Sequence, residues 1–220
     1  MHFFRIRASI KEFLCFVLLI NRQIRLENIT SFADAIFAFS ITFMAITINI
    51  PNLAQNLNQA QVIDKLLESL PEFEIYVISF FVIAIYWIAY HQIFNHIVGS
   101  HYIITWLTTV FLFFITLIPL ATNLQIGYGQ YQIVFALYAL VLTIAGALLT
   151  ITWLHATKNK LIDEILTQRE IHYISIDSIV SPVVFLLSIL VSFIDLRTAY
   201  YFWVVIMIPA KVVLRKKYHS

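Results

Sequence analysis

Residues 29–50 read ITSFADAIFAFSITFMAITINI, and this stretch decides the class of the fold. A helix needs about 20 predominantly apolar residues to cross a bilayer, and the stretch is long enough to do so. Its only charged residue is Asp34, and Pro51 follows directly after it. Proline ends a helix because it has no N–H and its ring clashes with the preceding turn. The stretch therefore predicts a transmembrane helix.

The composition of the whole chain agrees with a membrane protein. The 220 residues are 61% hydrophobic and 12% charged, with a mean hydropathy of +0.87. Soluble domains carry about 25% charged residues, so water is not the main solvent of this chain. Apolar segments of crossing length recur, and we place six of them at 29–50, 73–94, 102–122, 132–153, 176–194 and 198–214. The sequence predicts an all-α integral membrane fold with six transmembrane helices.

The distribution of Lys and Arg predicts the orientation. With the N-terminus in the cytoplasm, the inner segments contain twelve of the 14 Lys and Arg residues, whereas the outer loops contain only Lys65 and Arg197. Cationic loops are retained in the cytoplasm, so we expect both termini on the cytoplasmic side. A wrong number of spans would mix the two groups, so the same distribution supports the count of six.

Two domains are expected. Residues 1–24 form a cytoplasmic or interfacial arm, because the apolar run 13–20 is too short to span and no small-residue cleavage site follows it. Residues 25–220 form the transmembrane domain, with a short amphipathic helix expected within 52–70. Pro51, Pro71 and Pro119 are expected at span ends, Pro182 in a first helical turn, and Pro209 inside a span.

Asp34 requires an explanation, because a charged residue inside a span costs roughly 2.5 to 3.5 kcal/mol on insertion scales. On a helical wheel it shares a flank of small and aliphatic residues with Ala38, Ile41 and Ala45, suited to contact with another helix. Trp87 and His91 lie four residues apart at the matching depth of the second span and are the expected hydrogen-bond donors. Alternatively, Asp34 interacts with the helix dipole, Trp87 belongs to an interfacial belt and His91 faces headgroups.

A second stripe of the first span lies beside this flank and comprises Ala35, Phe39, Thr42 and Ile46. By spacing alone it is a face for packing against lipid, another helix or a pore.

Several function classes have no support in the sequence. A net charge of +2 with scattered cations offers no basic face for nucleic acid. His91, His96 and His101 recur every five residues, so they share no helical face and we expect no metal site. Catalytic and cofactor-binding motifs are absent, the lone Cys15 cannot form an internal disulfide, and the potassium filter string TVGYG does not occur. We expect no catalytic residues and no cofactor.

Segment 32–42, FADAIFAFSIT, resembles the first-helix signature of the transmembrane protein 175 potassium channel family, especially its single-repeat bacterial members. That signature reads approximately RxxxFSD followed by AI and T. Further similar pieces follow in order: SF at 79–80, WIAYHQIF at 87–94, PLAT at 119–122 and LYA at 137–139. The resemblance extends from residue 28 to about residue 214.

The resemblance implies a homotetramer in the cell membrane that conducts monovalent cations, potassium over sodium, as a leak channel. Each subunit would contribute six helices, and the first helix would line the pore. The family's constriction residues fall on Phe39, Thr42 and Ile46. These three belong to the stripe found by spacing.

Three positions depart from the family signature. Asn28 stands where the family has Arg, with Arg25 one turn earlier as a substitute. Ala33, between Phe32 and the motif Asp, replaces the family's Ser. Phe39 replaces a branched aliphatic residue at the first narrow position and would obstruct a fourfold axis unless its ring turns aside.

Two other functions compete with the channel. A proton-coupled secondary transporter is suggested by Asp34 and His91 as a proton pair, although no internal repeat is evident. A non-conducting membrane assembly protein is suggested by the bulk of Phe39. An intramembrane enzyme ranks last, since no two spans supply a nucleophile and a base.

Overall fold

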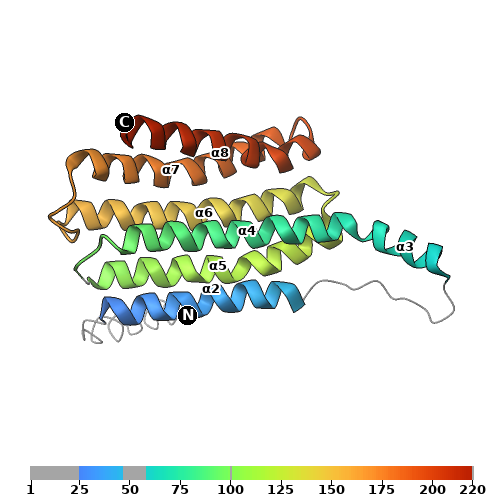
Figure 1. The fold of residues 1–220 in the computed structure, drawn as a ribbon, viewed down its shortest axis with the longest axis horizontal. Helices are drawn as coiled ribbons and strands as arrows, with labels where there is room; N and C mark the ends of the chain where they lie inside the picture. Colours follow the sequence, from blue (N-terminus) through green and yellow to red (C-terminus); the bar gives the residue numbers. More distant parts are fainter. Residues whose placement is uncertain (1–24, 47–57, 100, 220) are drawn as a thin grey trace, which may run out of the picture.

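A computed structural model describes residues 25–46, 58–99 and 101–219, and helices make up most of them (Figure 1). The helices are α2 (Leu26–Ile46), α3 (Gln59–Glu68), α4 (Leu70–Phe94), α5 (Tyr102–Tyr128), α6 (Gln132–Lys158), α7 (Gln168–Val191) and α8 (Leu196–His219). Six of them, all except α3, are long and apolar enough to cross a membrane. The predicted all-α membrane fold is confirmed. The expected N-terminal arm lies outside the described residues.

The long helices run side by side in an elongated bundle (Figure 1). α2 lies at one edge and packs against α4 and α5, while α8 lies at the opposite edge against α7. α5 packs on α6, and α6 on α7. The amphipathic helix expected in the first outer loop is α3, which continues the direction of α4 beyond the bundle.

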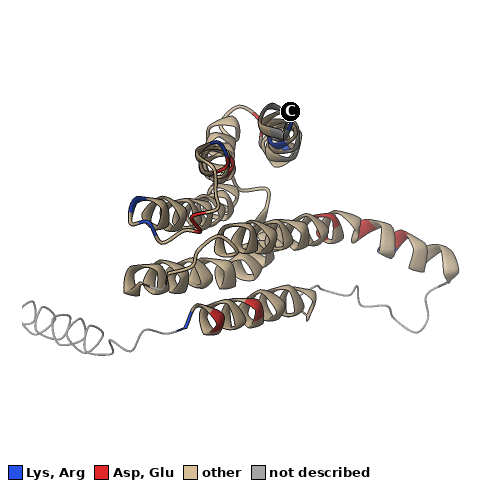
Figure 2. Ribbon diagram, turned by 60° about the vertical axis from the view of Figure 1, so that its left-hand side comes forward, with Lys and Arg blue, Asp and Glu red and all other residues tan. Residues whose placement is uncertain are grey.

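Basic side chains gather toward one end of this bundle. The start of α2, the α6–α7 connection and the end of α8 meet at one end, where most Lys and Arg of the described residues lie (Figure 2). The acidic residues of α3 and of the first turns of α4 lie toward the other end. The predicted cytoplasmic segments that the structure describes therefore share one end of the molecule.

Hydrogen bonds between helices stabilise the centre of the bundle, where lipid offers no hydrophobic driving force for association. The Tyr86 hydroxyl of α4 donates to the Leu142 carbonyl of α6 at 2.6 Å. Between α6 and α7, the Trp153 indole N–H donates to the Ser175 hydroxyl at 2.9 Å. Each bond satisfies a buried polar group that water cannot reach.

Several predicted element boundaries are wrong. α5 continues through Pro119, which was expected at a span end, and ends at Tyr128. α7 begins at Gln168 instead of residue 176, because Thr167 and Glu170 form a capping box there. Pro182 consequently lies deep inside α7, where it packs against α6, and not in a first turn.

Gly146 of α6 allows three helices to approach closely. A Cβ atom at this position would lie 3.0 Å from Cδ of Pro182 on α7 and 3.2 Å from the hydroxyl of Tyr86 on α4. Small residues at such crossings let transmembrane helices pack by close fit.

We expect Gly146→Val to destabilise the bundle by about 1–3 kcal/mol, because its methyl groups overpack this crossing. The measurement is the thermal unfolding midpoint of the purified protein in detergent. Gly127→Val is the matched control, since nothing lies within 4 Å of a Cβ atom there. Equal unfolding midpoints for the two variants would contradict the close-packing interpretation.

Candidate ion-conducting site

α2 presents one face to the rest of the protomer. Its buried residues are Ile29, Ala33, Phe37, Ser40 and Met44, which recur at three- and four-residue intervals. Phe37 is the centre of this face, because its ring centroid lies 6.0 Å from those of Tyr90 on α4 and Phe111 on α5. This packing fixes the rotation of α2 about its own axis.

The opposite face of α2 is left uncovered by the protomer. Phe39 is 60% exposed and Ile46 is 75% exposed, and Thr42 between them is also exposed. Ala35 lies on the same face. The stripe found by spacing is therefore the outward face of a helix at the edge of the bundle.

Local contacts orient two side chains on this outward face. The Thr42 hydroxyl donates to the Ala38 carbonyl at 2.8 Å within α2. Its oxygen keeps lone pairs that can face a cation. The Phe39 ring stacks on that of Phe43, one turn further along, with centroids 5.7 Å apart and an interplanar angle of 17°. The Phe39 ring thus lies along its own helix.

Asp34 joins α2 to α4 through the hydrogen bonds expected from the sequence. Its Oδ1 accepts from the Trp87 indole N–H at 2.8 Å and contacts His91 Nε2 at 2.7 Å. An N–H on Nε2 donates to the carboxylate in this geometry. The Asp34 side chain is 47% exposed and that of His91 is 29% exposed, so the network lies at the edge of the outward face.

The expected small-residue flank beside Asp34 is covered only in part within the protomer, where Ile41 packs against the core. Ala38 and Ala45 are exposed, and Ile41 is half-buried. The packing of Phe37 sets the rotation of α2 about its axis, and this rotation points Ala38 and Ala45 away from the rest of the protomer. The longer Asp34 side chain reaches back to α4.

The remaining motif residues occupy different environments. Ala33, at the position of the family's Ser, is fully buried against the bundle. Phe32 is 55% exposed, and Asn28 is exposed in the first turn of α2. Arg25 lies immediately before α2, and its carbonyl accepts the Asn28 N–H at 3.0 Å. The arginine substitute is therefore joined to Asn28 through its backbone.

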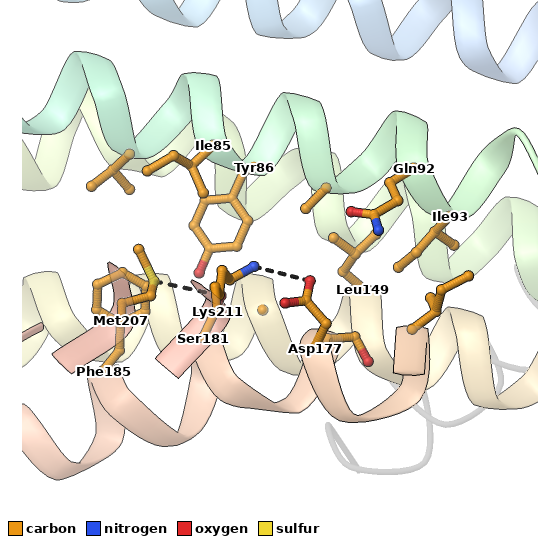
Figure 3. Close-up of a pocket in the computed structure, with 15 residues that line it drawn as sticks. Ile85, Tyr86, Gln92, Ile93, Leu149, Asp177, Ser181, Phe185, Met207 and Lys211 are labelled. Carbon is orange, nitrogen blue, oxygen red and sulfur yellow. Dashed lines mark hydrogen bonds and ion pairs between the residues drawn. The ribbon is translucent and has the colours of Figure 1, made fainter. Parts of the chain in front are cut away.

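Sequence reasoning missed a second charged site, between α7 and α8 (Figure 3). Nζ of Lys211 lies 3.1 Å from Oδ2 of Asp177, and the Asp177 side chain is only 11% exposed. Two opposite charges inside predicted spans were the available signal, because intramembrane charges usually pair with one another.

Comparisons with known proteins agree with the resemblance seen in the motifs. The family model for the endosomal/lysosomal potassium channel TMEM175 matches residues 28–119. No curated protein sequence matches the chain significantly.

Two solved structures share the fold. One is a homolog, from Chamaesiphon Minutus, of the lysosomal potassium-selective channel TMEM175, with a TM-score of 0.72 and 19% identity over 89% of this chain and 98% of that one. The other is a variant of the potassium channel MtTMEM175, with a TM-score of 0.60 and 17% identity over 89% of this chain and 93% of that one. The resemblance to this family is confirmed.

We expect Asp34→Ala to destabilise the protomer by about 1–2 kcal/mol, because it removes the acceptor that Trp87 and His91 share. Asp34→Asn keeps an oxygen and should cost less. In a Trp87→Phe background the loss caused by Asp34→Ala should shrink, since one donor is already gone. Thermal unfolding in detergent of the native protein, Asp34→Ala, Trp87→Phe and the double variant measures this coupling, and Asp34→Asn is measured beside them.

Asp64→Ala serves as the control for removing a carboxylate. Asp64 is exposed on α3, away from the network, so its loss should change stability by no more than about 0.5 kcal/mol. Equal losses from Asp34→Ala in both backgrounds would show that the indole bond contributes nothing.

Proposed function

On the premise that residues 28–119 match the TMEM175 family model and that the fold is that of solved TMEM175 channels, we propose that this chain is one subunit of a homo-oligomeric potassium-selective leak channel. The oligomer is a tetramer in the cell membrane, with both termini in the cytoplasm. Its pore is lined by α2, with Phe39, Thr42 and Ile46 facing the ion. The observation that carries the proposal is the outward face of α2.

A pore lined by that face needs more than one copy of the chain. Each protomer has one α2, at the edge of its bundle, and its outward face lies on the surface of the protomer. One helix cannot enclose a hole, so several copies must surround a common axis. The half-exposed Asp34 carboxylate supports this assembly, because polar groups inside a membrane usually face a bundle interior or water.

Selection would occur without a filter of backbone carbonyls. The Phe39 side chains of all subunits form one apolar constriction around the axis, and the Ile46 side chains form another. An ion must shed part of its hydration water to pass each constriction. Potassium holds its hydration water less tightly than sodium does. Partial dehydration therefore costs a potassium ion less free energy. Thr42 lies between Phe39 and Ile46 along α2, and its hydroxyl oxygen can face the partly dehydrated ion.

The Phe39 side chain permits a pore in this arrangement. A phenylalanine pointing at a fourfold axis would close it, but the Phe39 ring stacks along α2 against Phe43. A Phe39 ring that lies along α2 extends less far toward the pore axis than a ring that points away from the helix.

We expect potassium flux into proteoliposomes from the native protein, and a higher flux or altered K⁺/Na⁺ selectivity in Phe39→Ile and Phe39→Ala, because smaller side chains widen the constriction. Phe81→Ala is the matched control, since Phe81 is 59% exposed but lies on α4. Its flux should equal that of the native protein.

Other outcomes of this experiment favour the competing functions. Silence of all four proteins in well-folded oligomers would contradict the channel and favour a membrane assembly protein. Proton-coupled uptake that Asp34→Asn abolishes would favour the transporter, for which the 2.7 Å Asp34–His91 contact is the supporting observation.

Disulfide cross-linking tests where α2 lies in the oligomer. In a Cys15→Ser background, Ile46→Cys should give covalent dimers on mild oxidation, because copies of a pore-facing residue approach one another across the axis. A disulfide needs Cα atoms within about 7 Å or a small movement to that distance. Phe81→Cys, which is similarly exposed on α4, should remain uncross-linked. A protein that is monomeric in gentle detergent would overturn the proposal.

A further inference from the structure

The ion pair between α7 and α8 lies away from the proposed pore helix. α2 packs against α4 and α5, whereas Asp177 and Lys211 belong to α7 and α8. Both residues lie within helices of membrane-crossing length and composition. Charges at such positions are expensive unless paired, so their presence calls for a reason beyond holding two apolar helices together.

The pair forms the wall between two cavities. On its inner side is a cavity of about 20 Å³, which Tyr86 of α4 and Ser181 of α7 also line (Figure 3). On its outer side is a cleft of about 280 Å³ between α4, α7 and α8. Side chains of both charged residues line the cleft, and the Lys211 side chain is 29% exposed.

The cleft combines apolar walls with polar groups at one depth. Ile85, Ile88 and Val212 supply apolar walls, while Gln92 and Tyr173 join the ion pair as polar lining. Gln92 lies in the last turn of α4, and Tyr173 in the second turn of α7. These turns belong to the end of the bundle that carries most of the described Lys and Arg, which is where lipid headgroups are expected.

The charges in the cleft define what can bind. An anion placed near Lys211 would also meet the Asp177 carboxylate, and a cation placed near Asp177 would meet the ammonium of Lys211. A zwitterion fits both, because its phosphate accepts from Lys211 while its amine donates to Asp177. The ion pair leaves capacity for this, since an ammonium has three donors and a carboxylate about four acceptor sites.

We propose that this cleft binds the headgroup of a phospholipid whose amine is primary, that is, a phosphatidylethanolamine. The primary ammonium carries N–H donors for the Asp177 carboxylate and the Gln92 amide oxygen, whereas the quaternary ammonium of phosphatidylcholine has none. The acyl chains lie against the apolar walls at Ile85, Ile88 and Val212.

The test is native mass spectrometry of the full-length protein purified in detergent and mixed with defined lipids. The probes are phosphatidylethanolamine, its N-methyl and N,N-dimethyl forms, phosphatidylcholine and phosphatidylglycerol, all with the same acyl chains. Retention by the native protein should fall about tenfold from the primary to the quaternary amine, because charge-assisted hydrogen bonds are lost at each step.

Two variants separate the cleft from other lipid contacts. Asp177→Asn combined with Lys211→Gln keeps a hydrogen-bonded pair without charge and should retain all five lipids equally. Val212→Trp leaves the ion pair intact but fills the cleft, so this variant should not retain phosphatidylethanolamine. It tests the cleft independently if the double variant folds poorly. Tyr201→Phe is the control, because Tyr201 lies on another part of α8 and donates its hydrogen bond to Glu74 of α4.

Three results would overturn the proposal. They are equal retention of phosphatidylethanolamine and phosphatidylcholine by the native protein, stronger retention of phosphatidylglycerol, and a primary-amine preference that persists in the double variant and in Val212→Trp. None of these measurements depends on ion flux, so the lipid site and the channel can fail separately.

Discussion

The packing of Phe37 against Tyr90 and Phe111 is the interaction on which the arrangement of α2 depends. Lipid is as apolar as the helices, so α2 gains little from burying one hydrophobic face in preference to another. What distinguishes its faces is fit: the three rings meet with each pair of centroids 6.0 Å apart. This contact turns Phe39, one of the proposed constriction residues, outward.

The hydrogen bonds of Asp34 fix a second coordinate of α2. The aromatic cluster fixes the rotation of α2, while the bonds from Trp87 and His91 fix its height against α4, since hydrogen bonds tolerate less displacement than ring contacts. The carboxylate stays half-exposed, so it needs water or a neighbouring subunit at its open side. Asp177 differs, because its partner Lys211 and the surrounding helices cover it within one protomer.

The sequence predicts the six spans, the stripe of Phe39, Thr42 and Ile46 and the Asp34 bonds because each follows from local rules. Hydropathy and helical periodicity locate spans and faces, and charge inside a span demands a partner. The start of α7 was missed because Thr167 and Glu170 lie in a polar segment that hydropathy assigns to a loop. The Asp177–Lys211 contact was missed because pairing between α7 and α8 depends on how these helices are rotated and staggered, which span positions alone do not give.

The departure at Phe39 is best understood together with Phe43. A branched aliphatic side chain narrows a pore by its own width, whereas a phenylalanine can lie flat only if something holds its ring. Phe43, four residues later on the same face, provides that surface at 5.7 Å with nearly parallel rings. In the proposed pore, the width of the constriction would then depend on a pair of residues along each helix. Rotation of one ring of such a pair changes the width of the constriction, whereas a β-branched residue such as isoleucine has one strongly preferred χ1 rotamer in a helix.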